Sequence, residues 1–267
     1  MFADDPEFAT WIDHQAKLVD AVDEKDLLRL LLEMVEALSP GGYVTGGGLG
    51  HARGIVPRPG EDPLGSLADE AFAIYVGGGY LLDPFYRRYR AGESGCLFLS
   101  EIKPDGFEEA EFCRRFYTAF DIVDELVHIV QIDGRGAVLI SQSRLGSEGA
   151  FSGVEKMRHR VAHPLVAAHA RRCANLLFSH KAEGSVEPRT IDVAVDQFGA
   201  DLLTPREHEV IRLALYGHNA KSVAVQLGIS ADTVKVHRKR AYAKLRVSSQ
   251  GELFFKFLEH LGLEVYE

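Results

Sequence analysis

Apolar residues recur at three- and four-residue steps between residues 12 and 38, which predicts one amphipathic helix. Ser39-Pro40-Gly41-Gly42 follows and predicts the end of that helix. Similar helical patterns cover residues 64–78, 107–120 and 152–179. The last of these contains Pro164, so we expect a kink there, because proline removes a helical hydrogen bond.

Strand patterns lie between these predicted helices. Residues 43–56 predict strands or a loop, and the apolar run Cys96-Leu97-Phe98-Leu99 predicts a short strand. Residues 125–132 and 137–143 are strand-like and flank Asp133-Gly134-Arg135-Gly136, which predicts a β-hairpin. The fold class expected for this part is therefore α+β, an antiparallel sheet flanked by helices.

The pattern changes towards the C-terminus. Residues 181–202 have no clear amphipathic period and are punctuated by Gly184-Ser185 and Pro188. After them only helical patterns follow. We therefore expect an N-terminal domain over 1–180, a linker over 181–202 and an all-α domain over 203–267.

Helix boundaries in the last part are marked residue by residue. Thr204 and Glu207 have the spacing of a capping box, which begins a helix that Gly217 can end. A short second helix can run to Gly228, and Ser230 can cap a third. Two helices joined by a tight turn containing glycine form a helix-turn-helix unit.

Charge is distributed unevenly along the chain. The whole sequence has a formal net charge of −9. Residues 203–267 carry 10 Lys/Arg and 7 Asp/Glu, while residues 233–251 carry six Lys/Arg and no acid. A local basic stripe of this kind can contact nucleic-acid phosphates even on an acidic protein.

The third helix separates an inner face from an outer one. Val234, Ala241 and Leu245 share the inner face by their spacing. The outer face presents the residues expected to contact bases, which are Lys235, Val236 and Lys239. The residues expected to contact phosphates are Lys221, Thr233, Arg238, Arg240, Lys244 and Arg246.

Residues 203–247 resemble the helix-turn-helix domain of LuxR/FixJ/NarL-type transcription regulators. The matching motifs are Leu-Thr-x-Arg-Glu-x-Glu-Val at 203–210, Ala224-x-x-Leu-x-Ile-Ser230 and Thr-Val-Lys-x-His at 233–237. The resemblance implies a four-helix, LuxR-type DNA-binding domain in which Lys235, Val236 and Lys239 contact the DNA bases. It also implies that the helix over 250–261 helps to dimerise the domain, although its apolar residues fit core packing equally well. Arg240-Ala241 departs from the usual Asn-Ile, which leaves the DNA sequence open.

The N-terminal domain is expected to sense a small molecule. Asp4 and Asp5 precede no strand, unlike the paired acids of a receiver domain, and Gly46–Gly50 lacks the Gly-Lys-Ser/Thr ending of a nucleotide-binding loop. Residues 80–86 resemble the Asp-Pro element of acyl-homoserine-lactone receptors, but their upstream Trp-x-x-x-Tyr element is missing. The resemblance therefore favours a PAS- or GAF-like pocket for another ligand. The candidate lining residues are Tyr80, Asp83, Phe85, Tyr86, Phe98, Phe116 and Tyr117.

Other functions stay open at this point. The chain could be sigma-factor-like or respond to an acyl-homoserine lactone. A metal- or Cys-dependent enzyme fused to a DNA-binding domain is a further hypothesis, with Cys96 or Cys113 as the nucleophile. Glu155, His159 and His163 are four residues apart on one predicted helix, which suits a metal face, although a solvated helix face is favoured.

The expected partners follow from this interpretation. They are double-stranded DNA, an unknown small molecule, RNA polymerase and a second copy of the chain, with the helix over 152–179 as a candidate dimer interface. No cofactor, metal or catalytic residue is predicted. The three cysteines suggest no disulfide framework, and the acidic start has no secretory signal, so we expect a cytoplasmic protein that does not enter a membrane.

Overall fold

The computed structural model describes residues 6–50, 55–56, 75, 79–133, 135–179 and 188–262. Contacts divide the chain into two compact units. Unit 1 comprises Met1–Gly65, Arg88–Ile102 and Asp121–Ser185, and unit 2 comprises Ser66–Arg87, Lys103–Phe120 and Val186–Glu267. The division falls within helix α4 (Pro84–Arg90). The domain boundaries expected from the sequence stay a prediction.

Unit 1 contains an antiparallel sheet. Its five strands lie in the order β2-β1-β5-β4-β3. Their bounds are β1 (Tyr43–Gly50), β2 (Ile55–Val56), β3 (Gly95–Phe98), β4 (Ile122–Ile132) and β5 (Gly136–Leu145). The predicted hairpin is confirmed, since Ile132 of β4 pairs with Gly136 of β5. Gly136 has a φ of 116°, which explains a glycine at this turn.

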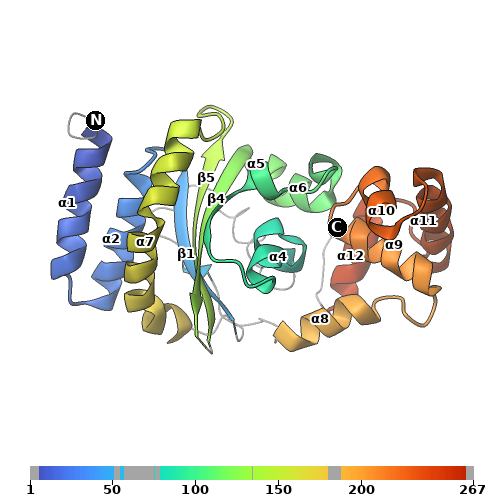
Figure 1. The fold of residues 1–267 in the computed structure, drawn as a ribbon. Helices are drawn as coiled ribbons and strands as arrows, with labels where there is room; N and C mark the ends of the chain where they lie inside the picture. Colours follow the sequence, from blue (N-terminus) through green and yellow to red (C-terminus); the bar gives the residue numbers. More distant parts are fainter. Residues whose placement is uncertain are drawn as a thin grey trace. The chain divides into compact units, whose positions relative to one another are not determined.

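Helices α1 (Pro6–Asp20), α2 (Glu24–Glu36) and α7 (Gly153–Ser179) lie on one side of this sheet (Figure 1). The single helix expected over 12–38 is wrong, because the chain breaks between α1 and α2. The Asp23 carboxylate there accepts a hydrogen bond from the Asp26 N–H at 3.2 Å, which caps a new helix. Helix α7 confirms the helix expected over 152–179 and contains Pro164.

Apolar side chains fill the space between these helices and the sheet. Leu31, Met34 and Val35 of α2 are fully buried there, with Val166 of α7 and Ile140 of β5. The glycines of β1 allow α2 to approach closely. A Cβ atom on Gly46 would lie 3.2 Å from Cδ2 of Leu32, which is tighter than ordinary packing.

Unit 2 contains short helices before the predicted DNA-binding domain. They are η1 (Gly79–Leu82), η2 (Phe107–Glu109), α6 (Glu111–Phe116) and η3 (Thr118–Phe120). The continuous helix expected over 107–120 is therefore wrong. Ala110 adopts an extended conformation that separates η2 from α6. Helix α5 (Leu99–Ile102) belongs to unit 1 and follows β3 directly.

Helix α8 (Pro188–Gln197) lies within the segment interpreted as a linker without an amphipathic period. Ala194 and Val195 on this helix, and Phe198 just after it, are buried. Part of the predicted linker therefore forms a helix with a buried side, although no amphipathic period was recognised in the sequence. The helix expected over 64–78 lies outside the described residues, apart from Tyr75.

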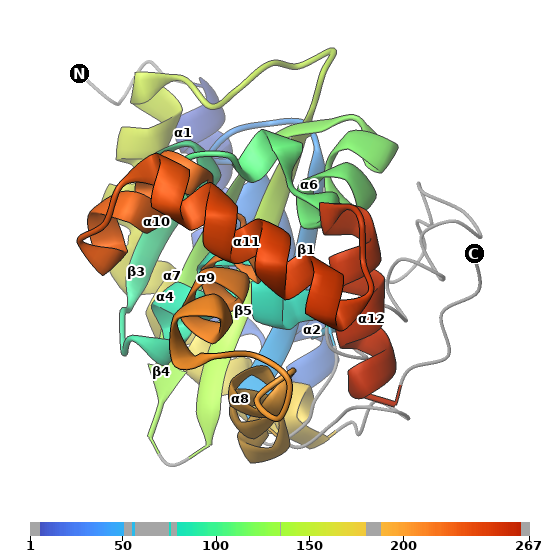
Figure 2. The ribbon, with the colours of Figure 1, turned by 90° about the vertical axis from the view of Figure 1, so that its right-hand side faces the viewer.

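The last four helices confirm the all-α prediction. They are α9 (Pro205–Leu215), α10 (Ala220–Leu227), α11 (Ala231–Leu245) and α12 (Gln250–His260). Val210, Leu213, Val223, Ala224 and Val234 form the shared core of α9, α10 and α11. Helix α11 runs between α10 and α12 (Figure 2).

Candidate functional site

Local hydrogen bonds fix the start of each helix in the helix-turn-helix unit. The Thr204 hydroxyl accepts from the Glu207 N–H, and the Glu207 carboxylate accepts from the Thr204 N–H, which confirms the capping box. Gly228 ends α10 in the left-handed conformation at φ 65°. The Ser230 hydroxyl then accepts from the Thr233 N–H at 3.1 Å and caps α11. The direction of α11 is therefore set by residues immediately before it.

Helix α11 is divided into a buried and an exposed face. Val234, Ala241 and Leu245 are at most 2% exposed. The predicted base-reading residues Lys235, Val236 and Lys239 lie on the other face and are all exposed. Val236 is 48% exposed and lies between the two lysines on this face.

An open groove of about 1060 Å³ runs along part of this face in unit 2. Its lining includes Lys235, Lys239 and Tyr242 of α11, together with Glu109 and Glu111. Both lysines therefore line a surface hollow. The groove carries charge of both signs, so shape as well as charge limits which ligand can enter it.

The predicted phosphate contacts fall into two groups. Lys221, Thr233, Arg240 and Arg246 are exposed, and Arg238 is half-buried. Lys244 instead donates a hydrogen bond to the Glu207 carboxylate at 2.7 Å. That bond is the main cause that lowers the pKa of Glu207 to about 2, with the Thr204 N–H contributing next. Lys244 thus pairs with Glu207 in this structure, and its assignment to a phosphate stays a prediction.

Four of the predicted pocket residues gather around Tyr75 in unit 2. The Tyr75 ring lies 6.1 Å from Tyr80 and 5.6 Å from Phe116, and Tyr80 stacks edge-on with Tyr86 at 4.9 Å. The Tyr75 hydroxyl donates to the Asp83 carboxylate at 2.6 Å. Sequence reasoning missed Tyr75, which is the residue that connects the others.

Asp83 is a buried acceptor next to these rings. Its carboxylate also accepts from the Phe85 N–H at 2.7 Å. Burial raises the pKa of Asp83 to about 6, although the hydrogen bonds from Tyr75 and the backbone oppose the rise. The carboxyl group is therefore held in a fixed position at the start of α4.

Of the remaining pocket candidates, Phe85 and Tyr117 adjoin this group and Phe98 does not. The Phe85 N–H donates to Asp83, and the Tyr117 ring lies 6.1 Å from Phe112, which lies 4.8 Å from Phe116. Tyr117 also packs edge-on against Phe107, with ring centroids 5.3 Å apart. Phe98 belongs to unit 1, where it packs edge-on against Phe151 at 5.8 Å in a separate apolar cluster. Phe85 is 1% exposed. Phe98 is thus core in unit 1, and its assignment to a shared pocket stays a prediction.

The cysteines and the expected metal face are arranged differently from the sequence hypothesis. Burial raises the pKa of the thiols of Cys96 and Cys113, which disfavours the thiolate that a nucleophile requires. Glu155 forms an ion pair with Arg144, and only His159 of the predicted face is fully buried. The solvated helix face that the sequence favoured for these residues is therefore wrong at His159, which is buried.

A buried polar cluster in unit 1 was not anticipated. It contains Cys96, His128 and His159, with Ser39 and Gln142 behind them. One signal could have revealed it. His128 lies between Val127 and Ile129 in the apolar run of β4, and a polar residue in such a core position requires a partner.

Comparisons with known proteins agree with this geometry. Residues 201–256 match the family of bacterial regulatory proteins described as the luxR family. A protein of Aeromonas salmonicida, named as an HTH-type transcriptional regulator in the exeN 3′ region, is 31% identical over 186 residues. That match covers 67% of this chain and 94% of the relative.

This chain belongs to the luxR family of transcription regulators. The transcriptional regulatory protein MctR of Rhizobium johnstonii is 37% identical over 62 residues, which cover 23% of this chain and 29% of that protein. The luxR-family regulator also shares a fold with the VqsR LBD domain of Pseudomonas aeruginosa. That match has a TM-score of 0.51 and 21% identity, and covers 62% of this chain and 96% of the other.

Within the ranges that the structure describes, no helix combines the length and the apolar character needed to cross a bilayer.

Proposed function

We propose that this luxR-family regulator binds specific DNA as a homodimer and inserts α11 of each protomer into a major groove. The observation that supports this is the exposed set Lys235, Val236 and Lys239 on a helix whose opposite face is buried. A major groove admits one α-helix. Lysine can donate to the acceptors of guanine, and the valine side chain can contact a thymine methyl group.

Exposed cations around α11 would hold the helix in register. Lys221 of α10, Arg240 of α11 and Arg246, which directly follows α11, can contact phosphates on either side of the groove. Thr233 can do so near the N-terminus of α11, where backbone N–H groups attract anions. In a dimer, the two α11 helices would meet half-sites about 34–36 Å apart. Recruitment of RNA polymerase is the expected output.

An apolar stripe on α7 supports the homodimer. Val154, Met157, Val161 and Leu165 are between 42% and 73% exposed and are spaced by three or four residues. They form one continuous apolar face on a helix whose other side packs in unit 1. By contrast, Leu253, Phe254, Phe257 and Leu258 of α12 are buried, which favours core packing for that helix.

Ligand control rests on the aromatic group around Tyr75 and on the fold shared with the VqsR LBD domain. We assign Tyr80, Asp83, Tyr86 and Phe116 to the binding of a small molecule. Such a ligand controls DNA binding only if it has different affinities for two arrangements of the dimer. No catalytic step is part of this function.

DNA binding by the full chain tests the proposal. We expect selective binding to the upstream region of its own gene, with a steep dependence on salt. Lys235→Ala/Lys239→Ala should weaken binding by about 100-fold or more, since each lost base contact costs about 1–3 kcal/mol. The matched control, Lys17→Ala/Arg90→Ala, removes the same charge from unit 1 and should bind normally. Equal binding by both double variants would contradict the proposal.

Acyl-homoserine lactones test the ligand class. The same DNA titration is repeated with lactones of several chain lengths, using wild type and Asp83→Asn. A lactone that changes the DNA affinity of wild type only would assign the autoinducer class. No change with any lactone would point to another small molecule, in agreement with the missing Trp-x-x-x-Tyr element.

A further inference from the structure

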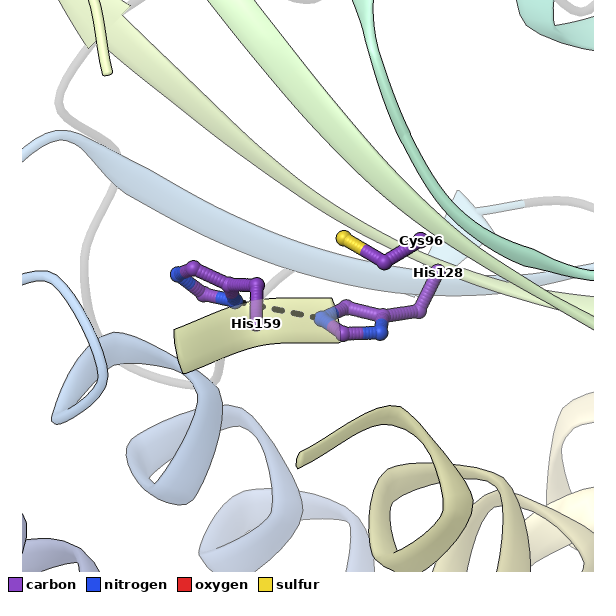
Figure 3. A group of neighbouring side chains, drawn as sticks. All are labelled: Cys96, His128 and His159. Carbon is purple, nitrogen blue, oxygen red and sulfur yellow. Dashed lines mark hydrogen bonds between the residues drawn. The ribbon is translucent and has the colours of Figure 1, made fainter. Parts of the chain in front are cut away.

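Three potential metal ligands converge in the core of unit 1. Cys96 lies on β3, His128 on β4 and His159 on α7, and their ligand atoms all lie within 4.8 Å of one another. Cys96 is 7% exposed, and both histidines are fully buried. Figure 3 shows the two imidazole rings joined by a hydrogen bond, with the sulfur atom beside them.

The hydrogen bonds behind His159 determine which of its ring nitrogens carries the proton. The Gln142 side-chain N–H groups donate to the carbonyl oxygens of Ser39 and Gly41, at 2.7 and 2.8 Å, which turns the Gln142 amide oxygen towards Ser39. The Ser39 hydroxyl donates to that oxygen at 2.9 Å. Ser39 must therefore accept from Nε2–H of His159, at 2.7 Å.

This arrangement leaves Nδ1 of His159 without a proton. The lone pair of this nitrogen points to the cluster. The nitrogen itself lies 3.2 Å from Nε2 of His128. Two nitrogen ligands on a tetrahedral zinc ion are separated by about 3.3 Å, given bond lengths of about 2.0–2.1 Å. The two nitrogens therefore already have the separation of paired metal ligands.

His128 has a matching partner on its other nitrogen. Its Nδ1 lies 3.1 Å from Nδ1 of His163, and the two rings are parallel. Without a metal, Nε2–H of His128 donates to Nδ1 of His159. On metal binding this proton can move to Nδ1 of His128 and donate to His163, which leaves Nε2 of His128 free for the metal. Metal-bound histidines usually donate their second ring N–H in this way, and here both histidines have such an acceptor.

From this geometry we infer that Cys96, His128 and His159 bind one borderline-soft divalent transition-metal ion, of which zinc is the reference case. One sulfur and two imidazole nitrogens suit zinc, whereas magnesium and calcium require oxygen ligands. The fourth position belongs to none of these three residues and can take water or another small ligand. The site connects β3, β4 and α7.

Binding follows a balanced exchange. The Cys96 thiol loses its proton to solvent as the sulfur–metal bond forms, and the hydrogen bond between His128 and His159 is replaced by two nitrogen–metal bonds. No oxidant or reductant is involved. Without a metal, the same side chains would form a hydrogen-bonded histidine pair next to an inert thiol, and this is the alternative that the experiment must separate.

Cobalt(II) titration of the purified, chelator-treated full chain tests the site. We expect one cobalt ion per chain, a near-ultraviolet charge-transfer band from the thiolate, release of one proton and displacement by zinc. Cys96→Ser should lose the charge-transfer band. The matched control, Cys173→Ser, replaces another buried cysteine of unit 1 and should keep it.

A further variant tests the residues behind the ligands. Ser39→Ala should weaken zinc binding by about 10–100-fold while keeping the charge-transfer band, as expected for an outer-shell residue. A wild-type protein without the band, or an unchanged band in Cys96→Ser, would overturn the proposal. If Cys96→Ser does not fold, as judged by circular dichroism, the wild-type spectrum alone decides.

Discussion

Helix α11 and the histidine cluster of unit 1 place their polar side chains in opposite ways. On α11 the cations are exposed or half-buried, and the start of the helix is set by a residue directly before it, Ser230. In the cluster, polar atoms are buried, and their partners are far apart in the sequence. Ser39 and Gln142, for example, are 103 residues apart. A surface built by local rules tolerates change, whereas a buried network depends on every member.

The largest loss of stability is expected at a position of unit 1 where the backbone leaves no room for a side chain. Gly42 has a φ of 70°, and a Cβ atom there would lie 1.8 Å from the Ser143 carbonyl oxygen. We expect Gly42→Ala to lower the free energy of unfolding by about 4 kcal/mol or more, measured by urea denaturation. Gly149→Ala is the control. Its φ is 73° but nothing lies within 4 Å, so only the backbone cost of about 1–3 kcal/mol should appear.

The next effect concerns the network behind His159. Ser39→Ala leaves the His159 N–H and the Gln142 amide oxygen without their partner. We expect a loss of about 2–4 kcal/mol in the metal-free protein, because each unsatisfied buried group costs about 1–3 kcal/mol. Thr45→Ala removes a part-buried hydroxyl–hydroxyl contact of the same sheet and should cost less. If both variants lost the same free energy of unfolding, the buried network would be no more sensitive to substitution than the rest of the sheet.

A smaller effect is expected in the capping box of α9. Lys244→Met removes the hydrogen bond to Glu207, which should cost about 1–3 kcal/mol at neutral pH. The pKa of Glu207 is lowered from 4.5 to about 2, so its contribution is complete above pH 4.5 and lost as the pH falls towards 2. The difference between wild type and Lys244→Met should therefore shrink across that range. A constant difference in thermal stability would show that Lys244 acts through packing alone.

The smallest effect should be at Val236. This side chain contributes little to the core because it is 48% exposed. Val236→Ala should leave the unfolding temperature unchanged within error and weaken specific DNA binding by less than about tenfold, with the loss confined to sites that carry a thymine at one position. The control Val225→Ala changes an 83% exposed valine on α10. A stability loss in Val236→Ala would place this residue in the core.

The same contrast explains what the sequence could predict. The four C-terminal helices follow from caps and glycines, so their order and the exposed face of α11 were predictable from neighbouring residues. The hairpin β4–β5 was also predictable, because its turn is local. The helix expected over 12–38 failed at Asp23, where one capping carboxylate outweighed a continuous apolar pattern.

Long-range placement could not be predicted from the pattern. His159 is in contact with His128, 31 residues away, and nothing in either local sequence indicates this pairing. The helical spacing of Glu155, His159 and His163 favoured a solvated face, whereas His159 is buried next to Cys96 and His128, which come from two other elements. Similarly, Phe98 and Tyr80 are both aromatic and buried, yet they belong to different units.

The order of strands in the sheet has a consequence for synthesis of the protein. Strand β1 pairs with β5, so Tyr43 meets Ser143, and the stretch between them contains β3 and β4. During synthesis, β1 emerges from the ribosome about a hundred residues before β5, its partner strand. Synthesis of these residues takes roughly 5–20 s at about 5–20 residues per second. During that interval the apolar face of α2 is uncovered. The nascent N-terminal segment is therefore prone to aggregation until β5 has been synthesised.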